Sequence, residues 1–216
     1  RAMRANGVDE NFVTGNASKK EKFQKWAETV PFTVGNPLFH WNQLELKRYF
    51  DIDEILQPSN ANEIFDKTNT VLAAKTPAQL LQEMKVELVC TTDDPTDSLE
   101  YHKQIADGDY PVRVLPTFRS DNLFFIDQSN FKNYLFDLEK CTDLQITSLK
   151  SLLKAISIRI DFFEANGCEL SDYGITGELI IEETTEEEVT SIFSKYLLGI
   201  KLSKDEVSKY RTYILF

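Results

Sequence analysis

A strand–helix–strand pattern near the middle of the chain restricts the possible folds more than any other feature. Residues 86–91 form a short, mostly apolar and β-branched run, residues 98–106 have helical spacing and end at Gly108, and residues 112–118 form a second strand-like run. Parallel strands need a long crossover, usually a helix, whereas antiparallel strands can be joined by a tight turn. The pattern therefore predicts an α/β fold with a parallel sheet, and a third strand from residue 168 to 173 or 175 would extend it.

The first part of the chain is predicted to be helical throughout. Ser18 and Glu21 have the spacing of a capping box, Pro31 ends the helix that they start, and Pro77 stands in the first turn of another helix. The expected helices span residues 19–30, 38–50, 59 or 60 to 74, and 77–85. We therefore divide the chain into a helical region, residues 1–85, and a βα-repeat region, residues 86–216.

Four more helices are expected after the second strand. They cover residues 130–140 and 147–166, a stretch that starts at Thr184 or Thr185, and the terminal stretch that follows the Ser203–Glu206 capping box. About three parallel strands can be recognised, whereas a closed (β/α)8 barrel takes about 250 residues. A chain of 216 residues that uses 85 of them before its first strand cannot close such a barrel.

Charge and composition exclude several classes of partner. The formal net charge is −11 and the pI is near 4.7, so the surface repels nucleic acid and anionic lipid. No run of about 18 apolar residues is present that would span a bilayer. The three cysteines are odd in number and widely spaced, which indicates reduced, mostly buried thiols and a cytoplasmic protein.

Three carboxylates follow the first predicted strand, at Asp93, Asp94 and Asp97. Such a cluster can bind a hard cation or position sugar hydroxyls. The same residues also suit a helix start, because Asp94 is a good N-cap, Pro95 a good first helical residue and Asp97 a favourable first-turn charge. The two interpretations are compatible, because catalytic groups collect at the carboxyl ends of barrel strands.

Arg119 directly follows the second predicted strand. Its guanidinium can hold a carboxylate through two parallel hydrogen bonds, or it can form an ordinary surface ion pair. In so acidic a chain, it is the residue whose position and chemistry best suit an anionic ligand.

The residues show no assembled catalytic constellation. The only histidines, His40 and His102, belong to separate predicted helices, and no zinc-ligand spacing, phosphate-binding loop or nucleophile motif is present. We therefore predict no catalytic residue and no metal ligand in this chain.

Several long runs resemble the uronate (glucuronate) isomerase family of the amidohydrolase superfamily. The resemblance extends along essentially the whole chain, in order. The runs that carry it are Arg1–Gly7, Phe32–Trp41, Leu44–Phe50, Thr91–Leu99 with Glu100 and His102, Val114–Pro116 with Arg119, and Gly167–Cys168 with Ser171–Asp172.

The resemblance implies a fold, a reaction and a set of ligands. It implies a (β/α)8 barrel with an N-terminal helical insertion, of which this chain would be an internal part: a partial barrel over residues 86–216. The reaction is the interconversion of D-glucuronate with D-fructuronate and of D-galacturonate with D-tagaturonate, by proton transfer between C2 and C1. A divalent metal, with zinc as the expected ion, would polarise the substrate's oxygens in the complete enzyme.

Only part of the family's active site can be transferred to this chain. Arg119 matches a substrate-binding arginine, and Asp93 and Asp94 match a strand-end motif, so these three residues are predicted to bind the substrate. The family's H-x-H metal motif and its distal metal-binding Asp would lie before Arg1 and after Phe216, so no metal is expected in this part. Many members have histidine where this chain has Tyr173.

Three hypotheses follow. The first is a cytoplasmic isomerase that acts on a small hexuronate, can form a homo-oligomer, and has no nucleic-acid or membrane partner. The second is a non-catalytic α/β binding or scaffold module derived from the same fold. The third is a different enzyme, with a hard-cation site at Asp93, Asp94 and Asp97.

Overall fold

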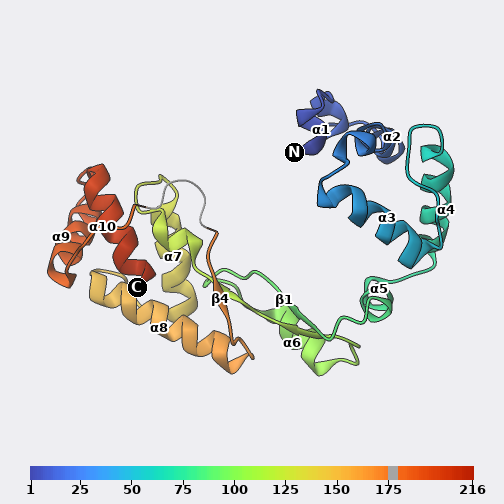
Figure 1. Ribbon diagram of the computed structural model, residues 1–216. Coiled ribbons are helices and arrows are strands. Elements are labelled where there is room, and N and C mark those ends of the chain that lie inside the picture. The colour runs from blue at the N-terminus through green and yellow to red at the C-terminus, as the bar shows by residue number, and fades with distance from the viewer. Residues whose placement is uncertain (175–179) are drawn as a thin grey trace. The chain divides into compact units, whose positions relative to one another are not determined.

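The computed structural model describes residues 1–174 and 180–216, and the chain divides into two compact units (Figure 1). The first unit spans Arg1–Lys85 and the second Val86–Phe216. The first is helical, whereas the second combines helices with short parallel strands, which makes the chain a helix-rich α/β protein. The predicted α/β class is therefore confirmed. That the two units correspond to a helical insertion and a barrel portion stays a prediction.

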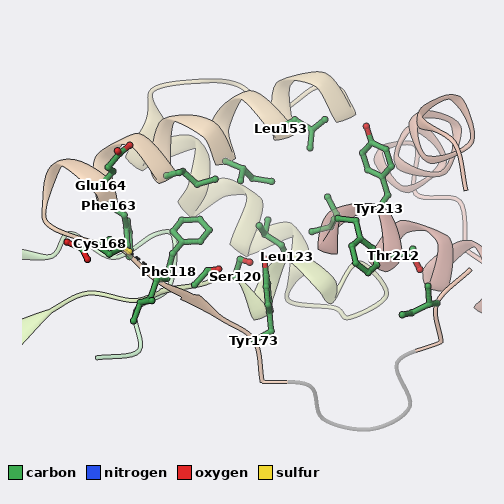
Figure 2. A pocket seen from close by; sticks show the side chains of 18 of the residues that line it. Phe118, Ser120, Leu123, Leu153, Phe163, Glu164, Cys168, Tyr173, Thr212 and Tyr213 are labelled. Carbon is green, nitrogen blue, oxygen red and sulfur yellow. Dashed lines mark hydrogen bonds between the residues drawn. The ribbon is translucent and has the colours of Figure 1, made fainter. Parts of the chain in front are cut away.

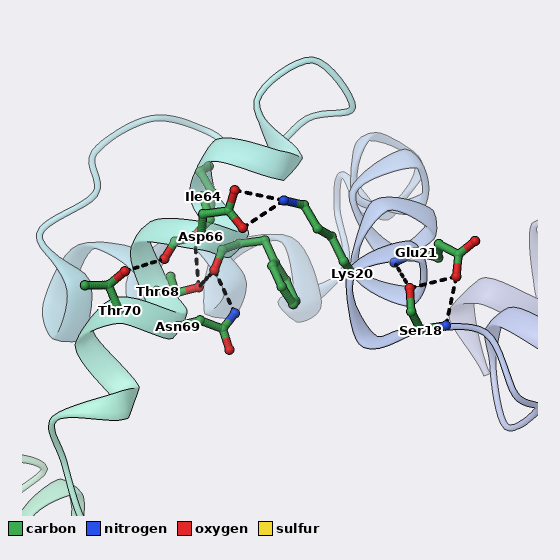
Figure 3. Close-up of polar contacts among 9 residues, drawn as sticks. Ser18, Lys20, Glu21, Ile64, Asp66, Thr68, Asn69 and Thr70 are labelled. Carbon is green, nitrogen blue, oxygen red and sulfur yellow. Dashed lines mark hydrogen bonds and ion pairs between the residues drawn. The ribbon is translucent and has the colours of Figure 1, made fainter.

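The helices of the first unit follow the predicted pattern closely. Its helices are α1 Ala2–Ala5, α2 Lys19–Thr29, α3 Pro37–Phe50, α4 Ala61–Ala73 and α5 Pro77–Glu83, with short 3-10 helices η1 Glu10–Phe12 and η2 Val30–Thr33. The predicted capping boxes at Ser18 and Ser203 are both formed. In each, side-chain oxygens accept N–H groups at the helix start that would otherwise be unpaired. At α2, the Ser18 hydroxyl accepts from Glu21 N–H and the Glu21 carboxylate accepts from Ser18 N–H (Figure 3).

Apolar contacts hold this unit together. Its buried core consists of Ala27, Val30, Leu46, Ile52, Leu56, Ala61 and Ile64. The Lys20 ammonium also lies 2.8 Å from both carboxylate oxygens of Asp66, so that α2 and α4 are joined by an ion pair (Figure 3). That pair is exposed, and exposed pairs stabilise by only about 0–1 kcal/mol. Burial of the apolar faces therefore contributes most of the stability.

The second unit contains four short strands in three parallel segments, because β2 and β3 follow one another in the same segment. β1 (Leu88–Cys90) pairs with β2 (Arg113–Leu115), and β3 (Phe118–Arg119) pairs with β4 (Ser171–Asp172), each in parallel. An isolated parallel bridge between Asp93 and Phe118 joins the two pairs. The predicted strands and their parallel order are confirmed, and the possible end of the third strand at residue 175 lies outside the described residues.

The predicted second strand, residues 112–118, is divided into β2 and β3. Pro116 lies between them and has no N–H to donate to a neighbouring strand. Beyond it, the N–H of Thr117 donates to a side chain, Asp93 Oδ2, at 3.2 Å. The strand direction continues through this gap because Asp93 N–H donates to Thr117 O and Arg119 N–H donates to Asp93 O.

Helices make up the rest of the second unit. They are α6 Glu100–Asp107, η3 Asp121–Phe124, α7 Phe131–Thr142, α8 Leu149–Ala165, α9 Glu186–Leu197 and α10 Lys204–Leu215. A core of buried side chains from α7 to α10 includes Phe131, Phe193 and Tyr210, whose rings pack on one another. Gly167 has the positive φ of +85° predicted for the residue that follows α8.

The start of α6 differs from the prediction. The helix begins at Glu100, preceded by Leu99 in a left-handed conformation with φ of +54°, and not at Ser98. Asp94 does not cap this helix. Its Oδ1 accepts from the N–H and the hydroxyl of Thr96 instead, which forms a separate tight turn.

Two further expectations can be compared with the structure. Cys90, Cys141 and Cys168 are free, but the expectation of mostly buried thiols is wrong, because Cys90 is exposed and the others are only partly buried. Among residues 1–174 and 180–216, no helix is both long enough and apolar enough to cross a bilayer.

A buried arginine attaches α8 to the loop after β1. Arg159 is only 4% exposed, and its Nε and Nη2 donate to the carbonyls of Pro95 and Asp97 at 2.5 and 2.8 Å. Its guanidinium carbon lies 4.0 Å from the ring centroid of Phe162. A buried cation is tolerated when its hydrogen bonds are satisfied, and here carbonyl oxygens and an aromatic face satisfy them.

Substitution of Arg159 by lysine is expected to destabilise the protein by about 1.5–3 kcal/mol, because an ammonium cannot reproduce two divergent hydrogen bonds to fixed carbonyls. Urea unfolding of Arg159→Lys measures this effect. Arg113→Lys, a change at an exposed arginine of the same unit, serves as the control and should change the unfolding free energy by less than about 0.5 kcal/mol. Equal effects of the two substitutions would contradict this assignment.

The contact between α9 and α10 predicts a pH dependence. The hydrogen bond from Lys195, followed by that from Ser203 N–H, lowers the pKa of Glu206 from 4.5 to about 2. A carboxylate whose pKa is lower in the folded state stabilises the fold above its unfolded value and loses that contribution as the pH falls. The unfolding free energy should therefore decline between pH 4.5 and about 2, and it should decline less steeply in Glu206→Gln. Glu187→Gln, at an exposed position in α9, is the control, and a slope in Glu206→Gln equal to wild type would refute the prediction.

Candidate functional site

Polar side chains gather where the three parallel segments end. Asp93 and Asp94 follow β1, Arg119 ends β3 and Asp172 ends β4. The carboxyl ends of parallel strands lie at the same edge of a sheet, which is where the active sites of α/β proteins are usually built. This edge is therefore the candidate site, and it contains all three residues predicted to contact substrate.

Arg119 is the cationic centre of this edge. Its Nη2 lies 3.1 Å from Asp172 Oδ2, and its Nε lies 3.5 Å from Asp121 Oδ2. Its side chain as a whole keeps 31% of its surface exposed, so the residue is not sealed inside the protein. One guanidinium with two carboxylates carries a local net charge of −1. An incoming anion must therefore compete with Asp121 and Asp172 for the arginine.

The pairing around Arg119 is incomplete. Arg119 Nε and Asp172 Oδ1 are both buried, and neither has a hydrogen-bond partner among the described residues. A guanidinium has five donors. Two ion pairs do not use all five, and because Nε is buried, a ligand would have to bind the terminal nitrogens.

Gly174 permits this arrangement. Its N–H donates to Asp121 Oδ1 at 2.8 Å, which holds the Asp121 carboxylate beside the arginine. A Cβ at position 174 would lie 2.7 Å from Asp121 Oδ2, closer than van der Waals contact allows. A larger residue at this position would therefore displace the Asp121 carboxylate.

Asp93 is a buried bracing residue in this structure. Its Oδ2 accepts from the Thr91 hydroxyl at 2.6 Å and from Thr117 N–H at 3.2 Å. The same oxygen lies 3.7 Å from His102 Nε2 of α6. Asp93 is therefore directed toward α6, away from the ion pairs of Arg119.

Asp94 is also engaged within the protein. Besides accepting from Thr96 through Oδ1, it accepts from Asn122 Nδ2 through Oδ2 at 2.8 Å. Burial, followed by the negative charge of Asp94, raises the pKa of the Tyr134 phenol of α7. The hydrogen bond to Asn122 thus connects the loop after β1 to η3.

The three predicted residues share an edge but have separate partners. Their contact with a substrate stays a prediction. Sequence reasoning missed Asp121 and Asp172 as the partners of Arg119, and it missed Arg159 and Tyr134. Only Asp121 and Asp172 had a local signal, because one lies two residues after Arg119 and the other ends the third strand.

The hypothesis of a cation site at Asp93, Asp94 and Asp97 is not supported. Asp97 Oδ2 accepts from Asp94 N–H, and the other two carboxylates bond to groups described above. Within residues 1–174 and 180–216, no group of three or more His, Cys, Asp or Glu side chains is arranged to hold a metal. These residues do not fit the metal that the family resemblance implies, so no chemical step is assigned to a metal here.

A groove of about 1350 Å³ lies on the other face of β3 and β4. Neighbouring residues of a strand point to opposite faces, so Phe118 packs on Phe163 of α8 at a centroid distance of 5.1 Å while Arg119 meets Asp172. Figure 2 shows the side chains of Phe118 and Phe163 toward one end of the groove and that of Tyr213 toward the other. The groove is not lined by Arg119, Asp93 or Asp94.

The groove has the character of uncovered core surface. It exceeds the usual range of ligand pockets, roughly 300–1,000 Å³, and aliphatic or aromatic side chains form much of its lining. Two of its lining residues, Ile160 and Phe216, are 47% and 87% exposed. Tyr173 lines the groove and packs on Phe124 at a centroid distance of 5.3 Å.

Comparison with known proteins gives one consistent result. The model of the glucuronate isomerase family matches residues 1–216. The uronate isomerase of Shouchella clausii is 46% identical over 218 residues, which cover 100% of this chain and 46% of that protein. The uronate isomerase of Bacillus pumilus is 44% identical over 214 residues, which cover 98% of this chain and 45% of that protein.

A solved structure agrees with these matches. The crystal structure of uronate isomerase from Thermotoga maritima superimposes with a TM-score of 0.90 and 33% identity, covering 99% of this chain and 47% of that one. The chain thus spans about half the length of the curated relatives it matches. Because the family match covers every residue and the relatives are this similar, the chain belongs to the glucuronate isomerase family.

Proposed function

We propose that this chain is part of a uronate isomerase that interconverts aldohexuronates and ketohexuronates. The pairs are D-glucuronate with D-fructuronate and D-galacturonate with D-tagaturonate, as the resemblance implies. The observation that carries the proposal is the position of Arg119. A partly exposed arginine ends a strand at the candidate site of a strongly acidic chain, and the curated relatives of this chain are uronate isomerases.

Arg119 has the chemistry to bind the one group that distinguishes a uronate from a neutral sugar. A planar guanidinium binds a carboxylate through parallel hydrogen bonds. The neighbouring Asp121 and Asp172 lower its affinity for anions in general, so a ligand must offer more than negative charge. Sugar hydroxyls can donate to carboxylate oxygens, which would favour a uronate over a simple anion at this edge.

The rest of the reaction needs groups beyond those described here. Proton transfer between C2 and C1 requires a base near those carbons, and a divalent metal, proposed to be zinc, would polarise the carbonyl when bound. In a protein of the relatives' length, residues other than the ones described would supply both. The proposed contribution of this chain is to bind and orient the carboxylate end of the substrate.

The proposal extends to the architecture and setting of the complete protein. The three parallel segments and their helices would form part of a (β/α)8 barrel, and residues 1–85 would form its helical insertion. The protein would be cytoplasmic, would act in carbohydrate catabolism on a free hexuronate, and would bind neither nucleic acid nor membrane. The apolar groove is compatible with association into a homo-oligomer.

The alternative is a non-catalytic α/β module that binds or scaffolds. The lack of a metal-ligand group among the described residues favours it. The flanking gene sequence separates the two proposals. An upstream H-x-H followed by the remaining barrel strands supports the isomerase, whereas stop codons at both ends support the module.

In the complete protein, Arg119→Ala should weaken uronate turnover by roughly 2–5 kcal/mol in transition-state binding, because it removes a charge-assisted partner of the substrate. Steady-state kinetics with glucuronate and galacturonate measures the loss. Arg113→Ala, a change at an exposed arginine at the start of β2, is the control and should retain wild-type rates. Wild-type kinetics in Arg119→Ala, with unchanged thermal unfolding, would eliminate the carboxylate role.

The chain of residues 1–216 on its own should not isomerise uronates, with or without added Zn²⁺, because the described residues offer no metal-ligand group. Incubation of the purified chain with galacturonate, followed by chromatographic assay for tagaturonate, tests this. Measurable turnover would show that this chain contains a catalytic set that we have not identified.

A further inference from the structure

A chain of short hydrogen bonds runs from α6 to the candidate site. His102 Nε2 lies 2.7 Å from Thr91 Oγ1, and Thr91 Oγ1 lies 2.6 Å from Asp93 Oδ2. The side chains of His102 and Asp93 are only 12% and 13% exposed. Water therefore competes little for these contacts, which makes their donor and acceptor roles well defined.

The proton positions follow from the chemistry of the three groups. A hydroxyl has one proton to donate, and an ionised carboxylate can only accept. Two oxygens can accept the Thr91 proton, Asp93 Oδ2 at 2.6 Å and Leu115 O at 3.3 Å, and the nearer one is the carboxylate. Thr91 therefore donates to Asp93 and has no second proton for His102. Thr91 Oγ1 then accepts from His102, so His102 has its proton on Nε2.

The chain of hydrogen bonds continues into the backbone of β3. Asp93 Oδ2, which Thr91 orients, also accepts the N–H of Thr117. The main chain of Asp93 accepts the N–H of Arg119 at 2.9 Å and donates to Thr117 O at 3.1 Å. A side chain of α6 is thereby connected, through Thr91 and Asp93, to the residue that ends β3.

We propose that His102 and Thr91 are positioning residues that fix the end of β3 and so set the place of the Arg119 guanidinium. His102 acts as the donor at Nε2 and Thr91 transmits its orientation to Asp93. Neither residue needs to touch the substrate. The functional part of this inference rests on the proposed role of Arg119, whereas the hydrogen-bond directions can be tested without it.

The first test uses the purified chain and no substrate. Long-range ¹⁵N–¹H NMR correlation should find the His102 proton on Nε2 at neutral pH. In His102→Leu, amide hydrogen exchange at Thr117 and Arg119 should accelerate about tenfold, because loss of one hydrogen bond loosens the strand end. Thr91→Val should have the same effect, and Thr91→Ser, which keeps the hydroxyl, should not.

The matched control is His40→Leu, a change at the other histidine of the chain, which is exposed on α3. It should leave both exchange rates unchanged. An Nε2 of His102 without a proton, or exchange in His102→Leu equal to wild type, would overturn the inference.

The second test measures kinetics in the complete protein. In His102→Leu, Arg119 should bind the substrate carboxylate less well, so KM for uronate should rise about tenfold while kcat changes little. Thr91→Val should have the same effect, whereas Thr91→Ser should have the wild-type KM. Wild-type KM in an active His102→Leu enzyme would overturn the positioning role. If the wild-type protein has no uronate turnover, the proposed function is refuted. The tautomer and the amide exchange rates would then still test whether His102 fixes the end of β3.

Discussion

The candidate site depends on the Asp93 carboxylate. It accepts the N–H of Thr117, which in a regular parallel sheet would donate to a main-chain carbonyl of the neighbouring strand. Pro116 interrupts the hydrogen-bonding of the second strand, and the Asp93 side chain accepts the next N–H, that of Thr117. The main chain of Asp93 then pairs with β3, which pairs with β4. The main-chain hydrogen bonds of Asp93 thus link the chain that follows β1 to β3, and the carboxylate adds the contact to Thr117 N–H.

This junction explains why so many polar groups converge on a small region. A buried carboxylate needs its acceptor capacity satisfied, and Thr91, Thr117 and His102 surround Asp93. The next loop is held in the same way by Asp94 with Asn122 and by Arg159 with two carbonyls. The result is a rigid edge from which Arg119 projects, and a rigid edge suits a residue that must orient a ligand.

The charges at this edge favour selective binding of an anionic ligand over tight binding of anions in general. In a chain of net charge −11, a lone arginine already paired with two carboxylates does not attract anions over long range. It can still discriminate at contact, because the competing carboxylates penalise ligands that cannot also donate hydrogen bonds. The groove on the opposite face is lined neither by Arg119 nor by Asp121 or Asp172, because side chains alternate between the two faces along β3.

Local patterns in the sequence were sufficient for the positions of most helices and of the three strand regions, but not for the start of α6 or the division of β2 from β3. Ser18 with Glu21 and Ser203 with Glu206 mark helix starts by their own hydrogen bonds, and the glycine after α8 has the left-handed conformation that favours glycine. Parallel pairing also followed from the strand–helix–strand order, since a crossover helix permits little else.

Contacts between distant residues could not be inferred in this way. The pairing of Arg119 with Asp172 joins positions 53 residues apart, and Arg159 reaches the carbonyl of Pro95 across 64 residues. Whether Asp94 caps a helix or closes a separate turn depended on where α6 packs, and that choice went against the local preference. Spacing along the chain determines short-range hydrogen bonds, whereas the partners of a buried charge are chosen by whichever groups the tertiary fold brings within reach.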